Sequence, residues 1–219
     1  LPTAPTVTPT TQTGNQVLSN DSTLKGTATA GAKIKVTVAG QTVAENIQVG
    51  SDGHWTVNLR EGLNSNHANQ TQLVAKDPVA VTQTVNGVES PSTNVTVAVG
   101  STTIEPSETG GTSLYAGAKE VVVKTPHDAG MFYLRYTDKD TGATKDLGFK
   151  RTSIDGPWTS VDSTQAVVKG TPTKDGFTET VTIAMKKPIK VGTASTKTNI
   201  SEGNYGTPAD WQAISVTNE

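Results

Sequence analysis

The feature that most constrains this chain is a series of short runs in which β-branched residues alternate with polar ones. In the run from Lys33 to Val38, the residues Ile34, Val36 and Val38 fall on one face, which is the two-residue period of a half-buried strand. Thr occupies 38 of the 219 positions, and β-branched side chains favour strands. Apolar residues nowhere keep a helical period beyond a turn or two. We therefore predict an all-β protein.

Strand-like runs divided by turn residues fill the first hundred residues. Residues 1–13 are rich in Pro and Thr and are expected to form an extended linker. Asn86-Gly87, between two of the runs, is the preferred pair for a type I′ hairpin turn. Seven strands in about 95 residues is the strand count of an immunoglobulin-like sandwich. The expected strands are 23–29, 33–39, 42–49, 55–59, 72–76, 79–85 and 88–99, the last interrupted by Pro91.

A polar segment, GSTTIEPSETGGTS (100–113), marks a boundary between two modules. It is rich in Gly, Ser, Thr and acid and has almost nothing to bury. We predict two tandem β-sandwich (immunoglobulin-like) domains at 1–100 and 113–219, joined by a linker at 101–112. The polar, turn-rich stretch 192–210 is predicted to be a loop or an irregular edge. Strands of the second module are expected at 119–124, 131–137, 145–151, 165–169, 177–185 and 212–217.

The first module resembles the bacterial Ig-like repeats of large cell-surface adhesins. The segments that carry the resemblance are GTATAGAKIKVTV (26–38), VGSDGHWTVNL (49–59) and VTQTVNGVESPSTNVTV (81–97). In that family an Asp-Gly-x-Trp hairpin recurs, and DGHW (52–55) matches it here. The resemblance covers roughly residues 5–100 and does not extend to the second module. It implies a spacer or a ligand-presenting module, and it supplies no catalytic residues.

Composition excludes several classes of function. The net charge is −2 with dispersed basic residues, which argues against a nucleic-acid partner. No apolar run approaches the roughly eighteen residues of a membrane span, so we expect no membrane insertion. The absence of Cys and the Thr-rich strands favour an extracellular, bacterial cell-surface location, with cell-wall attachment through regions outside this chain. Leu1-Pro2-Thr3 has no signal-peptide character, so we expect a monomeric fragment of a longer protein.

Nine of the ten aromatic residues fall in the second module, whereas Trp55 in the first is expected to be in the core. Because neighbours on a strand face opposite ways, Phe132 and Leu134 are expected to face inward and Tyr133 and Arg135 outward. Aromatic and Arg anchors dominate binding energetics where they cluster, so we expect this module to contact a host or matrix glycan or protein. The predicted ligand-binding residues are Tyr133, Arg135 and Tyr136, with Trp158 and Tyr205 as an alternative patch.

No catalytic, cofactor-binding or metal-binding motif stands out in the sequence. His54, His67 and His127 lie far apart and have no Cys partner, so we expect no zinc site. The run DKDTG (138–142) resembles the opening of a calcium loop but lacks the closing Glu. We therefore predict a tight turn there instead.

The second module contains candidate residues for one covalent reaction, the Lys–Asn isopeptide cross-link of Gram-positive surface sandwiches. It requires a neutral lysine whose pKa is lowered by burial, beside an acid. The candidate residues are Lys119 or Lys124 near the first strand of the second module, Asn218 near its last strand, and Glu179 between them. Lysines at strand edges are normally solvated, so we expect no such bond.

The sequence leaves three functions open. The first is a non-enzymatic adhesin segment, with an Ig-like spacer followed by a β-sandwich that contacts a ligand. The second is a purely structural pair of stalk modules. The third is an accessory, carbohydrate-binding region of a secreted polysaccharide-active enzyme. We expect the first of these.

Overall fold

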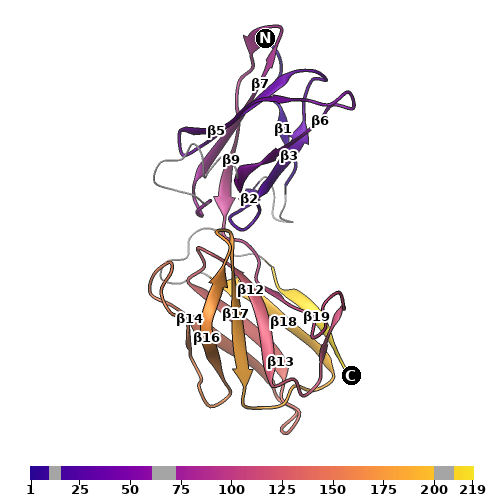
Figure 1. The fold of residues 1–219 in the computed structure, drawn as a ribbon, viewed down its shortest axis with the longest axis vertical. Coiled ribbons are helices and arrows are strands. Elements are labelled where there is room, and N and C mark those ends of the chain that lie inside the picture. Colours follow the sequence, from indigo (N-terminus) through magenta and orange to yellow (C-terminus); the bar gives the residue numbers. More distant parts are fainter. Residues whose placement is uncertain (10–15, 61–72, 200–209) are drawn as a thin grey trace. The chain divides into compact units, whose positions relative to one another are not determined.

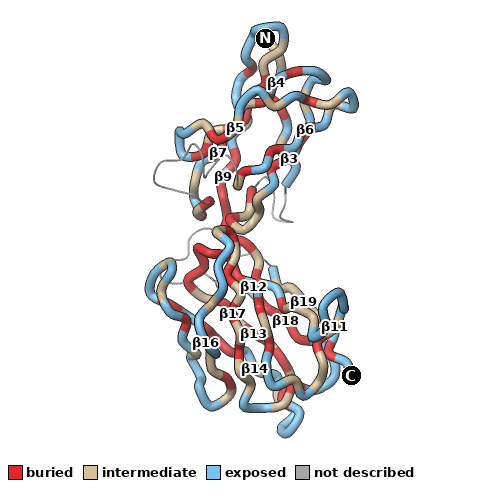
Figure 2. The backbone as a smooth tube through the Cα atoms, in the orientation of Figure 1, coloured by how far each residue is buried: buried red, intermediate tan, exposed pale blue. Residues whose placement is uncertain are grey.

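The computed structural model describes residues 1–9, 16–60, 73–199 and 210–219, and every element with described bounds is a β-strand. The chain divides into two compact units, Leu1–Ala98 and Val99–Glu219 (Figure 1). In each unit, buried residues alternate with exposed ones along the strands of two sheets (Figure 2), as in a β-sandwich. The predicted all-β class is confirmed. Within the described residues, no helix is long and apolar enough to cross a membrane.

The first unit consists of a three-stranded sheet and a six-stranded sheet. The smaller sheet has the order β1 (Thr6–Val7), β3 (Thr23–Thr27), β6 (His54–Asn58). The larger has the order β2 (Gln16–Leu18), β9 (Thr93–Ala98), β7 (Pro78–Val85), β4 (Lys33–Val38), β5 (Gln41–Gln48), and β8 (Val88–Glu89) pairs with β7. β2 runs parallel to β9, and the other pairs are antiparallel.

Two tight turns connect neighbouring strands of the larger sheet. Ala39-Gly40 joins β4 to β5 with φ angles of 50° and 80°, and Asn86-Gly87 joins β7 to β8 with 49° and 82°. Positive φ at both central residues is the type I′ geometry, so the hairpin turn predicted at Asn86-Gly87 is confirmed. β4 also pairs with β7, where Val36 lies opposite Val81, and both side chains are fully buried.

Trp55 on β6 is the largest side chain of the first core, and its predicted burial is confirmed. It is 2% exposed, and its Nε1–H donates to the backbone oxygen of Thr27 at 3.2 Å. Gly26, opposite Trp55 on β3, leaves room for the ring. A Cβ at Gly26 would lie 2.8 Å from Trp55 Cζ2 and 1.8 Å from the backbone oxygen of Thr6.

The second unit also consists of two sheets. The four-stranded sheet has the order β10 (Thr103–Ile104), β12 (Glu120–Pro126), β17 (Thr178–Met185), β16 (Ala166–Lys174). The six-stranded sheet has the order β11 (Ser113–Tyr115), β19 (Gln212–Thr217), β18 (Gly192–Asn199), β13 (Met131–Thr137), β14 (Thr144–Lys150), β15 (Thr159–Ser160). β11 runs parallel to β19.

Aromatic rings fill the core of the second unit. Phe132 on β13 and Phe149 on β14 are cross-strand partners, and their rings stack with centroids 5.1 Å apart. Trp158 packs edge-on against Phe132 at 5.0 Å. Offset-stacked and edge-on ring pairs are the favoured geometries of aromatic cores.

The segment 101–112, expected to be a linker, is part of the second unit. Residues 103–104 form β10, which pairs with β12. The buried Thr102 hydroxyl lies 2.9 Å from the hydroxyls of both Thr125 and Thr198, and Thr196 donates to the Thr102 backbone oxygen at 2.7 Å. The sequence of this segment suggested that it had almost nothing to bury. Its Thr102 is buried nevertheless, because the hydroxyl has hydrogen-bond partners, as buried hydroxyls require.

Three further expectations differ from the structure. Residues 192–199, expected to be a loop, form β18, which lies between β13 and β19 in its sheet. The linker expected at 1–13 contains β1, which pairs with β3. No strand occurs in 73–76, the described part of the run expected at 72–76. The polar sequence of β18 misled the prediction because its inward-facing residues are Ala194, Thr196 and Thr198 rather than large apolar ones.

Substitution of Trp55 tests the core of the first unit. Trp55→Ala should lower the free energy of unfolding of this unit by roughly 3–5 kcal/mol, because it leaves a large cavity. Chemical denaturation followed by circular dichroism measures the loss. Trp211→Ala, which removes a half-buried ring from the second unit, is the matched control and should cost less. Equal losses in the two variants would contradict the burial of Trp55.

Candidate functional site

The outer face of β13 carries two of the predicted ligand-binding residues. Phe132, Leu134 and Tyr136 are buried, whereas Tyr133 and Arg135 are partly exposed. The alternation follows from the pleat, which sends successive side chains to opposite faces. Tyr133 and Arg135 therefore lie on the same outward-facing surface of the six-stranded sheet.

Arg135 is held by two contacts on this outer face. Its Nε and Nη2 donate to Asp146 Oδ1 and Oδ2 at 2.8 and 3.0 Å, and Asp146 is its cross-strand partner on β14. Its guanidinium carbon lies 3.9 Å from the ring centroid of Trp211, a cation–π contact. The hydrogen bonds to Arg135 lower the pKa of Asp146, and those to Asp146 raise the pKa of Arg135. The pair is a rigid, bidentate fork with about two-fifths of each side chain exposed.

An apolar strip lies beside this ion pair. Gly148 is opposite Tyr133 on β14, and a Cβ there would lie 2.7 Å from Met131 Cε, 3.0 Å from Val161 Cγ2 and 3.3 Å from Tyr133 Cε1. The missing side chain lets these three groups meet over the sheet. Val161 is 58% exposed. We call Met131, Tyr133, Arg135, Asp146, Val161 and Trp211 the outer-face patch.

Trp211 and Asp146 were missed as site residues by sequence reasoning. Asp146 lies on β14, which is shifted by one residue from the strand predicted at 145–151, and Trp211 directly precedes β19, the strand predicted at 212–217. Their contact with Arg135 depends on which strands pair and in which register, and a shift of one residue would turn Asp146 to the other face. The sequence indicated only that a charged residue, Asp146, lies in a predicted strand and that an aromatic residue, Trp211, lies next to one.

Tyr136, predicted to bind ligand, lies in the core instead. Its side chain is 1% exposed, and its hydroxyl is 2.9 Å from Gln165 Oε1. Burial, together with the charges of Asp138 and Asp162, raises the pKa of Tyr136 to about 12. The prediction failed because Tyr136 keeps the parity of Phe132 and Leu134 and so faces inward.

The alternative patch of Trp158 and Tyr205 is not supported. Trp158 is 5% exposed and packs against Phe132. Tyr205 lies outside the described residues. Trp158 directly follows Gly156-Pro157, and after this pair the indole enters the core.

A second arginine forms a buried counterpart of the Arg135 site. The Arg151 side chain is fully buried, and its Nη1 lies 2.5 Å from Glu179 Oε2. Its Nε and Nη2 donate to the backbone oxygens of Ala129 and His127 at 2.8 and 2.7 Å, and its guanidinium lies 4.3 Å from the Trp158 ring centroid. Glu179, proposed as the acid of an isopeptide reaction, is therefore the partner of an arginine.

The other isopeptide candidates are exposed to solvent. Lys119, Lys124 and Asn218 are exposed, and Lys124 lies 3.6 Å from Glu105 as an ion pair. The reaction requires a desolvated lysine, and the structure provides that environment at none of the three.

The run at 138–142 forms a turn, as predicted. The Asp138 carboxylate accepts from the backbone N–H of Asp140 at 2.8 Å, and the N–H of Gly142 donates to the Asp138 backbone oxygen at 2.8 Å. Gly142 has a φ of 71°, which glycine adopts without strain. Within the described part of the chain, no three His, Cys, Asp or Glu side chains gather as metal ligands would.

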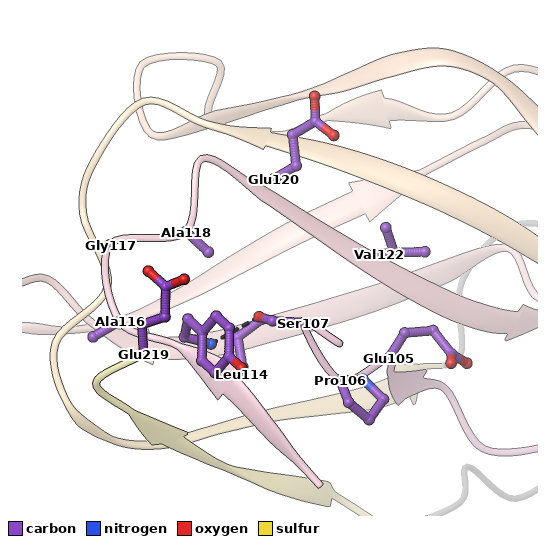
Figure 3. A pocket seen from close by; sticks show the side chains of 11 residues that line it. Glu105, Pro106, Ser107, Leu114, Ala116, Gly117, Ala118, Glu120, Val122 and Glu219 are labelled. Carbon is purple, nitrogen blue, oxygen red and sulfur yellow. Dashed lines mark hydrogen bonds between the residues drawn. The ribbon is translucent and has the colours of Figure 1, made fainter. Parts of the chain in front are cut away.

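One pocket of the second unit has several acidic residues in its lining. It has a volume of about 460 Å³ and includes Glu105, Glu120 and Glu219 in its lining. The three carboxylates stand on different sides of the opening (Figure 3), and Glu105 and Glu120 pair with Lys124 and Lys169. Partial burial of Tyr115, together with Glu108 and Glu219, raises the pKa of Tyr115. The carboxylates do not converge on a common point, and two of them already have cationic partners.

The sequence matches no protein-family model and no curated protein. A function for this chain must therefore be inferred from the geometry of its structure.

Titration of Tyr136 tests its burial. With a folded-state pKa of about 12 against an ordinary 10.0, the phenol stays protonated in the folded protein while it ionises in the unfolded chain. Its contribution to stability is therefore complete below pH 10 and is lost as the pH rises to about 12. Ultraviolet difference titration should show a component near pH 12 that Tyr136→Phe lacks. Identical titration curves for the two proteins would contradict the assignment.

Removal of each arginine compares the buried and the exposed ion pair. Arg151→Ala leaves Glu179 buried without its partner and should cost about 3–5 kcal/mol of unfolding free energy. Arg135→Ala removes a surface pair and should cost about 1 kcal/mol or less. Urea denaturation measures both. The double variant Arg151→Met with Glu179→Leu should recover part of the loss, because no uncompensated charge remains. A similar cost for both alanine variants would refute the contrast.

Proposed function

We propose that this chain is a non-enzymatic segment of a bacterial cell-surface adhesin, in which the first unit is a spacer and the second contacts a host or matrix ligand. The observation that carries the proposal is the outer-face patch, where half-exposed Tyr133 and Trp211 flank the Arg135–Asp146 pair. Aromatic and Arg side chains supply most of the binding energy at recognition surfaces.

The chemistry of the patch suits a glycan. The apolar strip of Tyr133, Met131 and Val161 offers a surface for the C–H face of a sugar ring. The adjacent Arg135–Asp146 fork offers donors and acceptors for hydroxyl groups. Because Asp146 and Trp211 hold Arg135 in place, ligand binding would cost little side-chain ordering. A protein ligand with an acidic or aromatic side chain would use the same contacts.

The strand orders support an immunoglobulin-like assignment for both units. In the second unit, A-B-E-D of an immunoglobulin sandwich corresponds to β10-β12-β17-β16, and G-F-C-C′ to β19-β18-β13-β14. In the first unit, A-B-E corresponds to β1-β3-β6, and G-F-C-C′ to β9-β7-β4-β5. The resemblance of residues 5–100 to bacterial Ig-like repeats agrees with this correspondence. Such modules in series suit an extended surface protein.

A spacer role for the first unit follows from what its surface offers. Its one aromatic residue, Trp55, is buried, and its one arginine is Arg60. The described residues of this unit therefore expose no aromatic ring, and the surface supplies mainly hydroxyl and amide groups.

Binding assays on the full chain test the proposal. The chain is screened against arrayed host glycans, matrix proteins and microbial or plant polysaccharides. Tyr133→Ala, Arg135→Ala and Trp211→Ala should each weaken binding of the ligand so identified by roughly 1–3 kcal/mol. Lys25→Ala, on the exposed face of β3 in the first unit, is the control and should leave binding unchanged.

Three outcomes separate the proposal from its alternatives. Binding of polysaccharides alone would favour an accessory region of a polysaccharide-active enzyme. Absence of binding to every class would favour a purely structural stalk. Binding that survives all three patch substitutions would overturn the assignment of the patch.

A further inference from the structure

Two lysines lie on the outer face of the six-stranded sheet, next to the outer-face patch. Lys197 on β18 is the cross-strand partner of Tyr133, and Lys150 on β14 is the cross-strand partner of Met131. Directly opposite residues of antiparallel strands share a face, with Cβ atoms about 5 Å apart. Both strand neighbours of Lys197 are buried, so Lys197 faces outward with Tyr133. Lys150 is exposed and Lys197 is partly exposed.

The outward positions of β13, β14 and β18 carry more positive than negative charge. Arg135, Lys150 and Lys197 are the cations, and Asp146 is the one carboxylate at these positions. Asp146 is already bound by Arg135. In the described part of the chain, neither lysine ammonium forms an ion pair. Two cationic groups on this face therefore have no internal counter-charge, and the complementary ligand is an anion.

The two lysines border the apolar strip of the patch from different strands. β14 and β18 flank β13 and so lie two strand spacings apart, or roughly 10 Å. Lys197 continues the row of Tyr133 on one side, and Lys150 lies beside Met131 on the other. Each ammonium is a point charge on a flexible four-carbon stem. A ring placed on Tyr133 would therefore have a mobile cation within reach on either side.

The backbone of this face is not open to a ligand. β13, β14 and β18 each have a neighbouring strand on both sides, so their N–H and C=O groups are used in the sheet. An extended peptide binds a sheet chiefly through main-chain hydrogen bonds at an edge strand, and this face offers no edge. A sugar ring needs only an apolar surface and side-chain hydrogen bonds, and its other hydroxyls stay in water. An acidic polysaccharide fits the apolar strip and the ammonium groups together.

We propose that the outer-face patch, extended by Lys150 and Lys197, binds an acidic polysaccharide through its carboxylate or sulfate groups. The inference rests on the adhesin proposal above and narrows its ligand class. One sugar ring lies on Tyr133, and the two lysines bind acidic groups of this sugar and of its neighbour in the polymer. Arg135 donates to ligand hydroxyls with the N–H groups that Asp146 does not occupy.

Binding of acidic polysaccharides and their neutral counterparts to the full chain tests the proposal. Hyaluronan, polygalacturonate, chondroitin sulfate and heparin are immobilised beside derivatives of each with reduced carboxyl groups and without sulfate. Biolayer interferometry measures the affinity. We expect at least one acidic polymer to bind about tenfold tighter than its neutral derivative, with an affinity that falls between about 0.05 and about 0.5 M NaCl, because salt screens exposed charges. Binding of the first two polymers would assign the carboxylate, and binding of the sulfated polymers alone would assign the sulfate.

Lysines of the same unit provide matched variants. The double variant Lys150→Gln with Lys197→Gln should weaken binding of that polysaccharide at least about threefold, as expected for the loss of two exposed ion pairs. Lys150→Arg with Lys197→Arg keeps the charge and should keep the binding. Lys119→Gln with Lys186→Gln removes the same charge from exposed positions beside β12 and β17 of the other sheet and should leave binding unchanged. Circular dichroism checks that each variant is folded.

The remaining outcomes contradict the proposal in distinguishable ways. Equal binding of the acidic and neutral polymers would refute an anionic ligand and would leave the adhesin proposal standing. So would a neutral glycan or a matrix protein that binds through Tyr133 while no acidic polysaccharide binds. Polyglutamate bound as tightly as the polysaccharides would mean that the face recognises acidic polymers of any kind. Equal losses in the two glutamine double variants would place the ligand away from this face. Absence of binding to any glycan or protein would remove both proposals.

Discussion

The buried pair of Arg151 and Glu179 is the interaction on which the second unit most depends. Arg151 follows β14 of the six-stranded sheet, and Glu179 lies on β17 of the four-stranded sheet, so the pair joins the two layers through the core. The same guanidinium binds the backbone of the β12–β13 connection at His127 and Ala129, and it covers the ring of Trp158. A charge without these partners could not be buried at an acceptable free energy, so the surrounding structure must form together with the pair.

Two arginines with similar contacts have opposite roles because their environments differ. Arg135 and Arg151 each bind a carboxylate and lie over a tryptophan ring. Arg135 keeps about two-fifths of its side chain in water, where the pair contributes little to stability but can exchange contacts with a ligand. Arg151 has no such freedom, because its donors meet internal acceptors. Around this network, among the described residues, Glu179 Oε1 and Trp158 Nε1–H have no hydrogen-bond partner.

Hydroxyl groups perform part of the packing that apolar residues perform elsewhere. Thr102, Thr125 and Thr198 are fully buried, and the Thr102 hydroxyl is hydrogen-bonded to the other two hydroxyls, which joins the start of the second unit to β12 and to β18. Each methyl group adds apolar contact while each hydroxyl finds a partner, so a polar sequence builds a sandwich interior. The Thr content of the chain therefore reflects both strand propensity and buried hydrogen bonding.

The sequence by itself determined the all-β class, most strand positions and the inward-facing residues, because a two-residue period is a local property of the chain. It also determined the I′ turn at Asn86-Gly87 and the outward direction of Tyr133 and Arg135. Only the tertiary structure decided that Tyr136 and Trp158 are core residues, that 192–199 is an internal strand, and that Asp146 and Trp211 meet Arg135. Those facts depend on strand pairing and register between residues far apart in the chain, and no local pattern in the sequence encodes them.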